Sequence, residues 1–165
     1  MSEAEPIRIW EETVDAAWVD YNGHMNVAYY VLIFDHATDA FLIQIGMGEE
    51  LRERTGSSVF VAEAHVTYDN EVLEGERVYI TTQVVGSDEK RLHLFHQMHK
   101  CADDSLCATN ELMILHVNLQ SRKVGPFPDF IHTAIKDISK IHAALEKPSK
   151  CGRTIAIPNR PKPSS

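Results

Sequence analysis

The sequence predicts an α+β fold, in which a curved antiparallel sheet of about five strands wraps around one long central helix. Three observations lead to this prediction. One β-rich segment precedes a single long segment with helical periodicity, four more β-rich segments follow, and a shorter helical segment comes last. The chain has no internal repeat, and 165 residues with 44% hydrophobic content can bury the core of one domain.

The first predicted strand covers residues 7–18, with a bulge or interruption near Glu11 and Glu12. A helix of residues 27–44 follows, with Asn26 as its N-cap and Gly46 and Gly48 as stop signals. Apolar residues recur in this helix at steps of three and four. They predict one buried stripe made of Val27, Tyr30, Val31, Phe34, Ala37, Phe41 and Ile45.

Four strands are predicted after the long helix, at residues 57–68, 76–85, 91–100 and 108–119. Turn-like residues separate them, so they should form an antiparallel meander. Residues 130–145 then form a short amphipathic C-terminal helix. The single domain is expected to end at residue 146, because prolines discourage regular structure in the tail 147–165, at Pro148, Pro158, Pro161 and Pro163.

Composition restricts the partners. The formal net charge is −8 and no basic stripe is present, so nucleic acid is excluded as a partner. A few local cations can still meet the phosphates of a small molecule. No apolar stretch approaches the roughly 18 residues of a membrane span, and residues 1–6 do not resemble a signal peptide. We therefore expect a soluble cytoplasmic protein without a membrane partner.

The cysteines and histidines predict no metal or other cofactor. Cys101, Cys107 and Cys151 are odd in number and have no zinc-knuckle spacing, which suits ordinary thiols in a reducing compartment. His93, His96 and His99 lie in one predicted strand at a spacing of three. They cannot all face one side of a strand, so they make a poor metal triad.

The segment Trp18-Val19-Asp20-Tyr21-Asn22-Gly23-His24-Met25-Asn26 leads into the long helix, which continues with Tyr30 and Phe34-Asp35-His36-Ala37. It resembles the signature of the 4-hydroxybenzoyl-CoA-thioesterase-like hotdog enzymes, Asp-x-x-Gly-His-x-Asn before an aromatic-rich helix. The resemblance covers about residues 7–128. It implies a hotdog fold and an acyl-CoA thioesterase, with subunits paired edge to edge as a homodimer or homotetramer.

A narrower resemblance is to the thioesterases of carnitine breakdown, which act on betainyl-CoA. It rests on residues 19–25 and on the later Glu63-Ala64-His65. These residues leave the identity of the substrate's acyl group open.

Thioester hydrolysis needs a group that attacks the carbonyl or activates water, and a donor directed at the developing oxyanion. The resemblance assigns the first role to Asp20, as nucleophile or general base. Unpaired N–H groups at Asn26 and Val27 would polarise the carbonyl. Gly23 would allow a positive backbone dihedral, and His24 would position the thioester. The alternative is that residues 20–23 are only a turn and Asn26 only a cap.

Glu63 is expected in the middle of a strand, on the same face as Val61 and His65. It is either a second catalytic carboxylate, a counter-charge for a cationic acyl group, or part of an exposed edge. His65 and four aromatic residues are further candidates for substrate contacts, although the aromatics could instead be core residues: Trp18, Tyr21, Tyr30 and Tyr68. Three cations are candidates for the phosphates of coenzyme A: Arg91, Arg122 and Lys123.

Two other functions fit the same fold. One is a hydratase or dehydratase, although the Asp20–Asn26 loop favours hydrolysis. The other is a non-catalytic module that binds or senses acyl-CoA.

Overall fold

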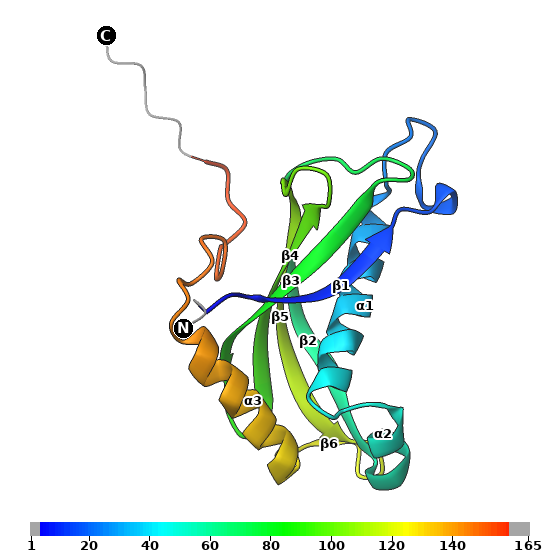
Figure 1. Ribbon diagram of the computed structural model, residues 1–165. Helices are drawn as coiled ribbons and strands as arrows, with labels where there is room; N and C mark the ends of the chain where they lie inside the picture. Colours follow the sequence, from blue (N-terminus) through cyan, green and yellow to red (C-terminus); the bar gives the residue numbers. More distant parts are fainter. Residues whose placement is uncertain (1–3, 159–165) are drawn as a thin grey trace.

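A computed structural model describes residues 4–158 as a curved sheet wrapped around one long helix (Figure 1). The predicted α+β arrangement is confirmed. The strands are β1 (Ile7–Thr13), β2 (Ser57–Tyr68), β3 (Arg77–Ser87), β4 (Arg91–Lys100), β5 (Leu106–Asn118) and β6 (Lys123–Val124). The helices are η1 (Ala16–Trp18), α1 (Val27–Gln44), α2 (Glu49–Thr55) and α3 (Asp129–His142).

All strand pairs are antiparallel, in the order β1-β3-β4-β5-β2, with β6 beside the end of β5. The predicted meander of four strands is therefore wrong for the first of them, because β2 pairs with β5 and not with β3. β1 and β2 are therefore the two edges of the main sheet. β1 is short and carries the charged residues Arg8, Glu11 and Glu12, whereas β2 has twelve residues and only one carboxylate, Glu63. A long edge with few charges is a template for pairing with another strand.

The first predicted strand is too long. It ends at Thr13, because Asp15 caps the short helix η1 by accepting a hydrogen bond from the Ala17 N–H at 2.7 Å. The register shift in β1 lies between Arg8 and Trp10, not at Glu11 and Glu12 as predicted.

Helix α1 has the predicted bounds, but its buried stripe differs from the predicted one. Val27 and Val31 are 58% and 44% exposed, while Ile33, Thr38 and Leu42 are buried in their place. The helix lies against the concave face of the sheet, so the stripe follows the line of contact with that face.

Besides η1, two further elements were not predicted from the sequence, α2 and β6. Helix α2 begins after Gly48 and ends at Gly56, which adopts φ +70°, and it has acidic residues in its first turn and basic residues in its last. That charge order is a helix signal that the sequence does contain. The two-residue strand β6 has no comparable signal.

Helix α3 covers the part of the β3 edge that lies beyond the end of its pairing with β1. The pairing of β1 with β3 stops at Thr82, and two residues further on the Val84 N–H donates to His142 Nδ1 at 2.9 Å. Ile131 and Ile135 belong to the same core cluster as the end of α1. Ile141, in contrast, is 59% exposed.

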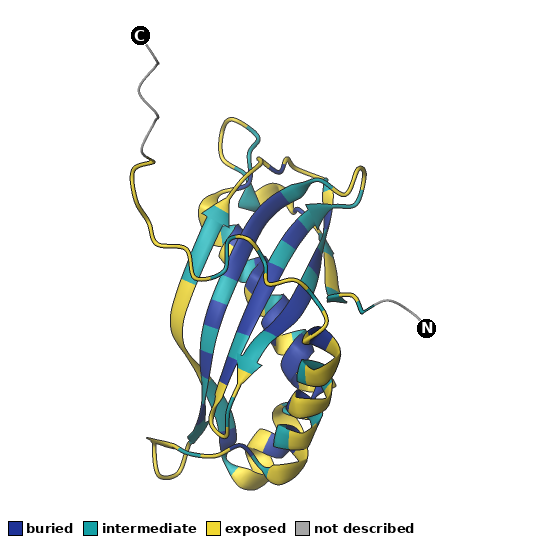
Figure 2. Ribbon diagram, turned by 90° about the vertical axis from the view of Figure 1, so that its left-hand side faces the viewer, coloured by how far each residue is buried: buried dark blue, intermediate teal, exposed yellow. Residues whose placement is uncertain are grey.

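The convex face of the sheet is crossed by the chain that follows α3 (Figure 2). The Gln83 side chain donates to the Glu146 carbonyl at 3.2 Å, and Lys150 forms an ion pair with Asp69. Residues 150–152 of the predicted tail therefore contact the sheet, whereas Ile155 and Ile157 are almost fully exposed. Residues 159–165 lie outside the described residues. A domain limit at residue 146 stays a prediction.

His96 is buried between α1 and the sheet, where its Nε2 meets the Thr38 hydroxyl at 3.0 Å and its Nδ1 meets the Thr82 hydroxyl at 2.8 Å. Burial lowers the pKa of His96 to about 3, from an ordinary value of 6.5. The unfolded chain binds the proton more tightly, so this residue should reduce stability progressively as pH falls from 6.5 toward 3.

We expect the His96→Gln variant, which cannot titrate, to lose less stability between about pH 7 and pH 5 than the wild-type protein. Urea unfolding at the two pH values measures the difference. Equal losses in both proteins would contradict the assignment.

Candidate active site

A tight loop before α1 holds Asp20. A β-bridge between Val19 and Met25 closes the loop, and the Gly23 N–H donates to the Asp20 carbonyl at 2.9 Å. One carboxylate oxygen, Oδ1, accepts from the Asn22 N–H at 2.8 Å and from the His24 N–H at 3.4 Å. The residue is exposed. The other oxygen, Oδ2, has no partner among residues 4–158, so the carboxylate can hold the turn and still act on a ligand.

The start of α1 supplies a free donor beside this loop. Asn26 is the N-cap, as predicted, and its side chain accepts from the Ala28 N–H at 3.0 Å. The Asn26 N–H already donates to the Trp18 carbonyl at 2.9 Å. The Val27 N–H has no acceptor in the described part of the chain, so of the two predicted donors it is the available one.

Gly23 has φ +79°, and a methyl group added to it would meet nothing within 4 Å. Gly75 offers a matched control in the neighbouring turn, with φ +76° and equally open space. Alanine at either position should lower the free energy of unfolding by about 1 kcal/mol through backbone strain alone.

If the Asp20 loop takes part in catalysis, only Gly23→Ala should also reduce the turnover number. Urea unfolding and a thioesterase assay of the two variants test this expectation. Equal activity in both variants would count against a catalytic loop.

The aromatic residues near the loop fall into two groups. Trp18 stacks on Tyr29 with 5.5 Å between ring centroids, and both are partly buried, while Tyr21 is 98% exposed. Tyr30 is a core residue whose hydroxyl accepts from the Val72 N–H at 3.0 Å, and its ring meets the edge of Tyr68. Unlike the buried Tyr30, the partly buried Trp18 and Tyr29 keep some ring surface open to a ligand.

His24 points to a carboxylate that the sequence analysis did not consider. Its Nδ1 lies 3.1 Å from Glu71 Oε2, and His24 also forms a β-bridge with Leu73. Glu71 was missed as a candidate. Glu71 comes to the loop only through this bridge, which no local pattern in the sequence indicates.

Glu63 lies away from the Asp20 loop. It pairs with Met113 of β5 and lines a pocket on the convex face together with His65, His93 and Glu111. The predicted common face of Val61 and Glu63 is wrong, because the register shifts between them and Val61 pairs with Ile114. The extra residue of a β-bulge turns the two side chains to opposite faces. Within one chain, Asp20 and Glu63 are not brought together.

The three candidate cations lie at the end of the sheet that is far from the loop. Arg91 begins β4 and is paired with Asp88, while Arg122 and Lys123 follow the end of β5. Arg122 adopts φ +57°. The loop, in contrast, bridges to Leu73, just before the start of β3.

Comparisons with known proteins agree with this geometry. Residues 14–135 match the profile of the thioesterase-like superfamily. A betainyl-CoA thioesterase of Pseudomonas aeruginosa is 37% identical over 155 residues, which are 94% of this chain and 98% of that protein. An L-carnitine dehydrogenase/betainyl-CoA thioesterase of Rhizobium meliloti is 38% identical over 150 residues, or 91% of this chain and 30% of that protein.

A Staphylococcus aureus protein solved in complex with CoA has a similar structure. The TM-score is 0.87 and the sequences are 32% identical, over 95% of this chain and all of that chain (100%).

The fold and the loop thus define a hotdog enzyme that hydrolyses acyl-CoA thioesters. The chain belongs to the thioesterase-like superfamily. The resemblance noted in the sequence is confirmed. No helix among the described residues is long and apolar enough to cross a membrane.

Proposed function

We propose that this thioesterase hydrolyses betainyl-CoA to betaine and coenzyme A, with Asp20 as its catalytic carboxylate. The proposed substrate rests on the 37% identity to a betainyl-CoA thioesterase across nearly the whole of both chains. Membership of a thioesterase family favours hydrolysis over the hydratase and dehydratase reactions and over a purely sensing role.

Asp20 acts through its free oxygen, Oδ2, which attacks the acyl carbon or takes a proton from the attacking water. The Val27 N–H, at the positive end of α1, stabilises the oxyanion of the tetrahedral intermediate. The carbon–sulfur bond then breaks. Water supplies the oxygen of the carboxylate product, and coenzyme A leaves as the thiol.

The trimethylammonium group of betainyl-CoA is attracted to aromatic ring faces and to carboxylates. The Trp18 and Tyr29 pair offers such faces beside the loop, and Glu71 offers a negative charge on its other side. Tyr21, which is almost fully exposed, is available to close over the acyl group.

The active unit is a homodimer or a higher assembly that contains it, formed through the β2 edges. In an antiparallel pair, the Tyr68 end of one β2 lies beside the Ser57 end of the other. Arg122 and Lys123 of one subunit, near the Ser57 end, would then approach the Asp20 loop of its partner. Such an arrangement supplies cations for the phosphates of coenzyme A, which a single chain keeps at the far end of its sheet.

A substrate pair tests the acyl group directly. Betainyl-CoA and its uncharged isostere, tert-butylacetyl-CoA, have the same shape and differ in one charge. We expect kcat/KM for betainyl-CoA to be at least about tenfold higher, and Trp18→Leu to reduce that preference. Thiol release measures both rates. Equal rates would refute the betainyl assignment while leaving the thioesterase intact, and no release from any acyl-CoA would refute the hydrolase function.

A further inference from the structure

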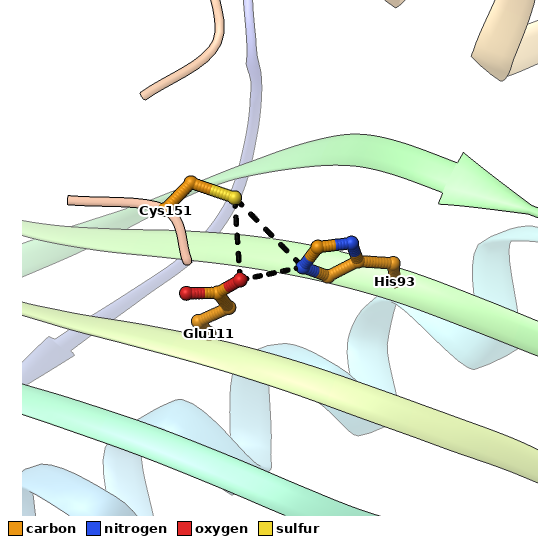
Figure 3. A group of neighbouring side chains, drawn as sticks. All are labelled: His93, Glu111 and Cys151. Atoms are coloured by element: carbon orange, nitrogen blue, oxygen red, sulfur yellow. Dashed lines mark hydrogen bonds and ion pairs between the residues drawn. The ribbon is translucent and has the colours of Figure 1, made fainter. Parts of the chain in front are cut away.

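Three side chains from distant parts of the sequence meet on the convex face of the sheet (Figure 3). His93 comes from β4, Glu111 from β5 and Cys151 from the segment after α3. His93 Nε2 lies 2.7 Å from Glu111 Oε1, and Cys151 Sγ lies 3.2 Å from the same oxygen. The distance from Cys151 Sγ to His93 Nε2 is 3.8 Å.

The arrangement does not fit a catalytic cysteine. In a nucleophile–base–acid relay, the thiol and the acid use different nitrogens of the histidine. Here Cys151 and Glu111 both meet Nε2 of His93. Burial and the adjacent Glu111 carboxylate also raise the pKa of the Cys151 thiol to about 11, which keeps it protonated at neutral pH.

The same convergence fits a metal ion. One ligand atom from each residue lies within 4.8 Å of the other two. Around tetrahedral Zn²⁺, bond lengths of about 2.0 to 2.3 Å separate the ligand atoms by roughly 3.3 to 3.8 Å. The pair of His93 and Glu111 would open by about half an ångström. Cysteine, histidine and carboxylate together are ligands typical of zinc.

The surroundings support the role of a ligand set. The Gly152 N–H donates to Glu111 Oε2 at 2.8 Å, which orients the carboxylate and leaves Oε1 for the cluster. A cavity of about 270 Å³ adjoins the cluster and is lined by Glu63 and His65, with room for a fourth ligand.

We propose that His93, Glu111 and Cys151 form a zinc site that fastens the segment around Cys151 to the convex face of the sheet. The thiol proton, which Cys151 donates in its hydrogen bond to Glu111, is released when the metal binds. The expectation of no metal rested on the spacing of the cysteines and on the spacing of the histidines, each taken separately. It did not combine Cys151 with His93, which lies 58 positions earlier in the chain.

The segment after α3 covers an apolar part of the convex face. Phe95 pairs with Glu111 and belongs to neither core cluster, yet it is only 2% exposed. Its neighbour Gln83 bonds to Glu146 at the start of the covering segment. A metal ion held by Cys151 would therefore keep this apolar part of the sheet covered.

Zinc titration of the full-length, metal-stripped protein against a chromophoric chelator tests the site. We expect one Zn²⁺ per chain and a higher melting temperature with zinc. With Co²⁺, a thiolate-to-metal charge-transfer band should appear. Zinc should also slow tryptic cleavage after Lys150 and Arg153.

Cys151→Ser should weaken zinc binding on the order of 100-fold or more and remove the cobalt band. Its hydroxyl can still donate to Glu111, so the segment should stay docked. Cys101→Ser is the matched control, because Cys101 is an equally half-buried thiol outside the cluster. Absence of stoichiometric zinc binding by the wild-type protein, or undiminished binding by Cys151→Ser, would overturn the proposal. Neither result bears on thioester hydrolysis.

Discussion

Asp20→Asn should lower kcat on the order of 100-fold or more while leaving KM and the melting temperature nearly unchanged. The amide oxygen of the substituted side chain can accept the same hydrogen bonds from Asn22 and His24, so the loop keeps its shape. What the substitution removes is the negative oxygen that attacks or takes a proton. Steady-state thiol release and thermal unfolding measure the two effects.

Asp15→Asn is the matched control. Asp15 is also an exposed aspartate whose Oδ1 accepts from the N–H two residues ahead, that of Ala17. It caps η1 and lies outside the proposed reaction, so its substitution should leave kcat unchanged. Full activity in Asp20→Asn would show that the aspartate only shapes the turn. Glu63→Gln would then become the next variant to assay.

Phe60→Lys should convert the assembly into monomers and abolish most of the activity. Phe60 lies on the exposed edge strand β2, and its side chain is 61% exposed in a single chain. Burial of the exposed part of one phenylalanine from each subunit contributes about 2 to 4 kcal/mol to a dimer. A charge at this position should therefore raise the dissociation constant on the order of 100-fold or more. Analytical ultracentrifugation measures it.

Ile141→Lys serves as the control, because Ile141 is 59% exposed but lies on α3, away from the β2 edge. Lysine is chosen at both positions so that repulsion of the coenzyme A phosphates cannot explain a loss of activity. A Phe60→Lys protein that stays dimeric would exclude the β2 edge as the interface. A monomer with full activity would exclude a site shared between subunits.

Local patterns predicted the elements well. The bounds of α1, β2 and β4 are as predicted, and Asn26 caps α1. These features depend on residues close in sequence, through helical periodicity, alternation and cap chemistry. The Asp20 loop was also recognisable, since the hydrogen bonds of Asp20 all join residues within five positions of one another. The catalytic roles themselves stay predictions.

Sequence alone therefore determined the order of the longer strands and helices, the loop and the class of enzyme. Tertiary structure decided which side chains meet. The bulge after Val61 turns Glu63 to the convex face, and the fold brings Glu71 to His24 and Cys151 to Glu111. Each of these contacts depends on the register of a strand or on a segment that crosses a face of the sheet. A shift of one residue in strand register moves every side chain of that strand to the other face. Short-range sequence patterns contain no information on such long-range pairings.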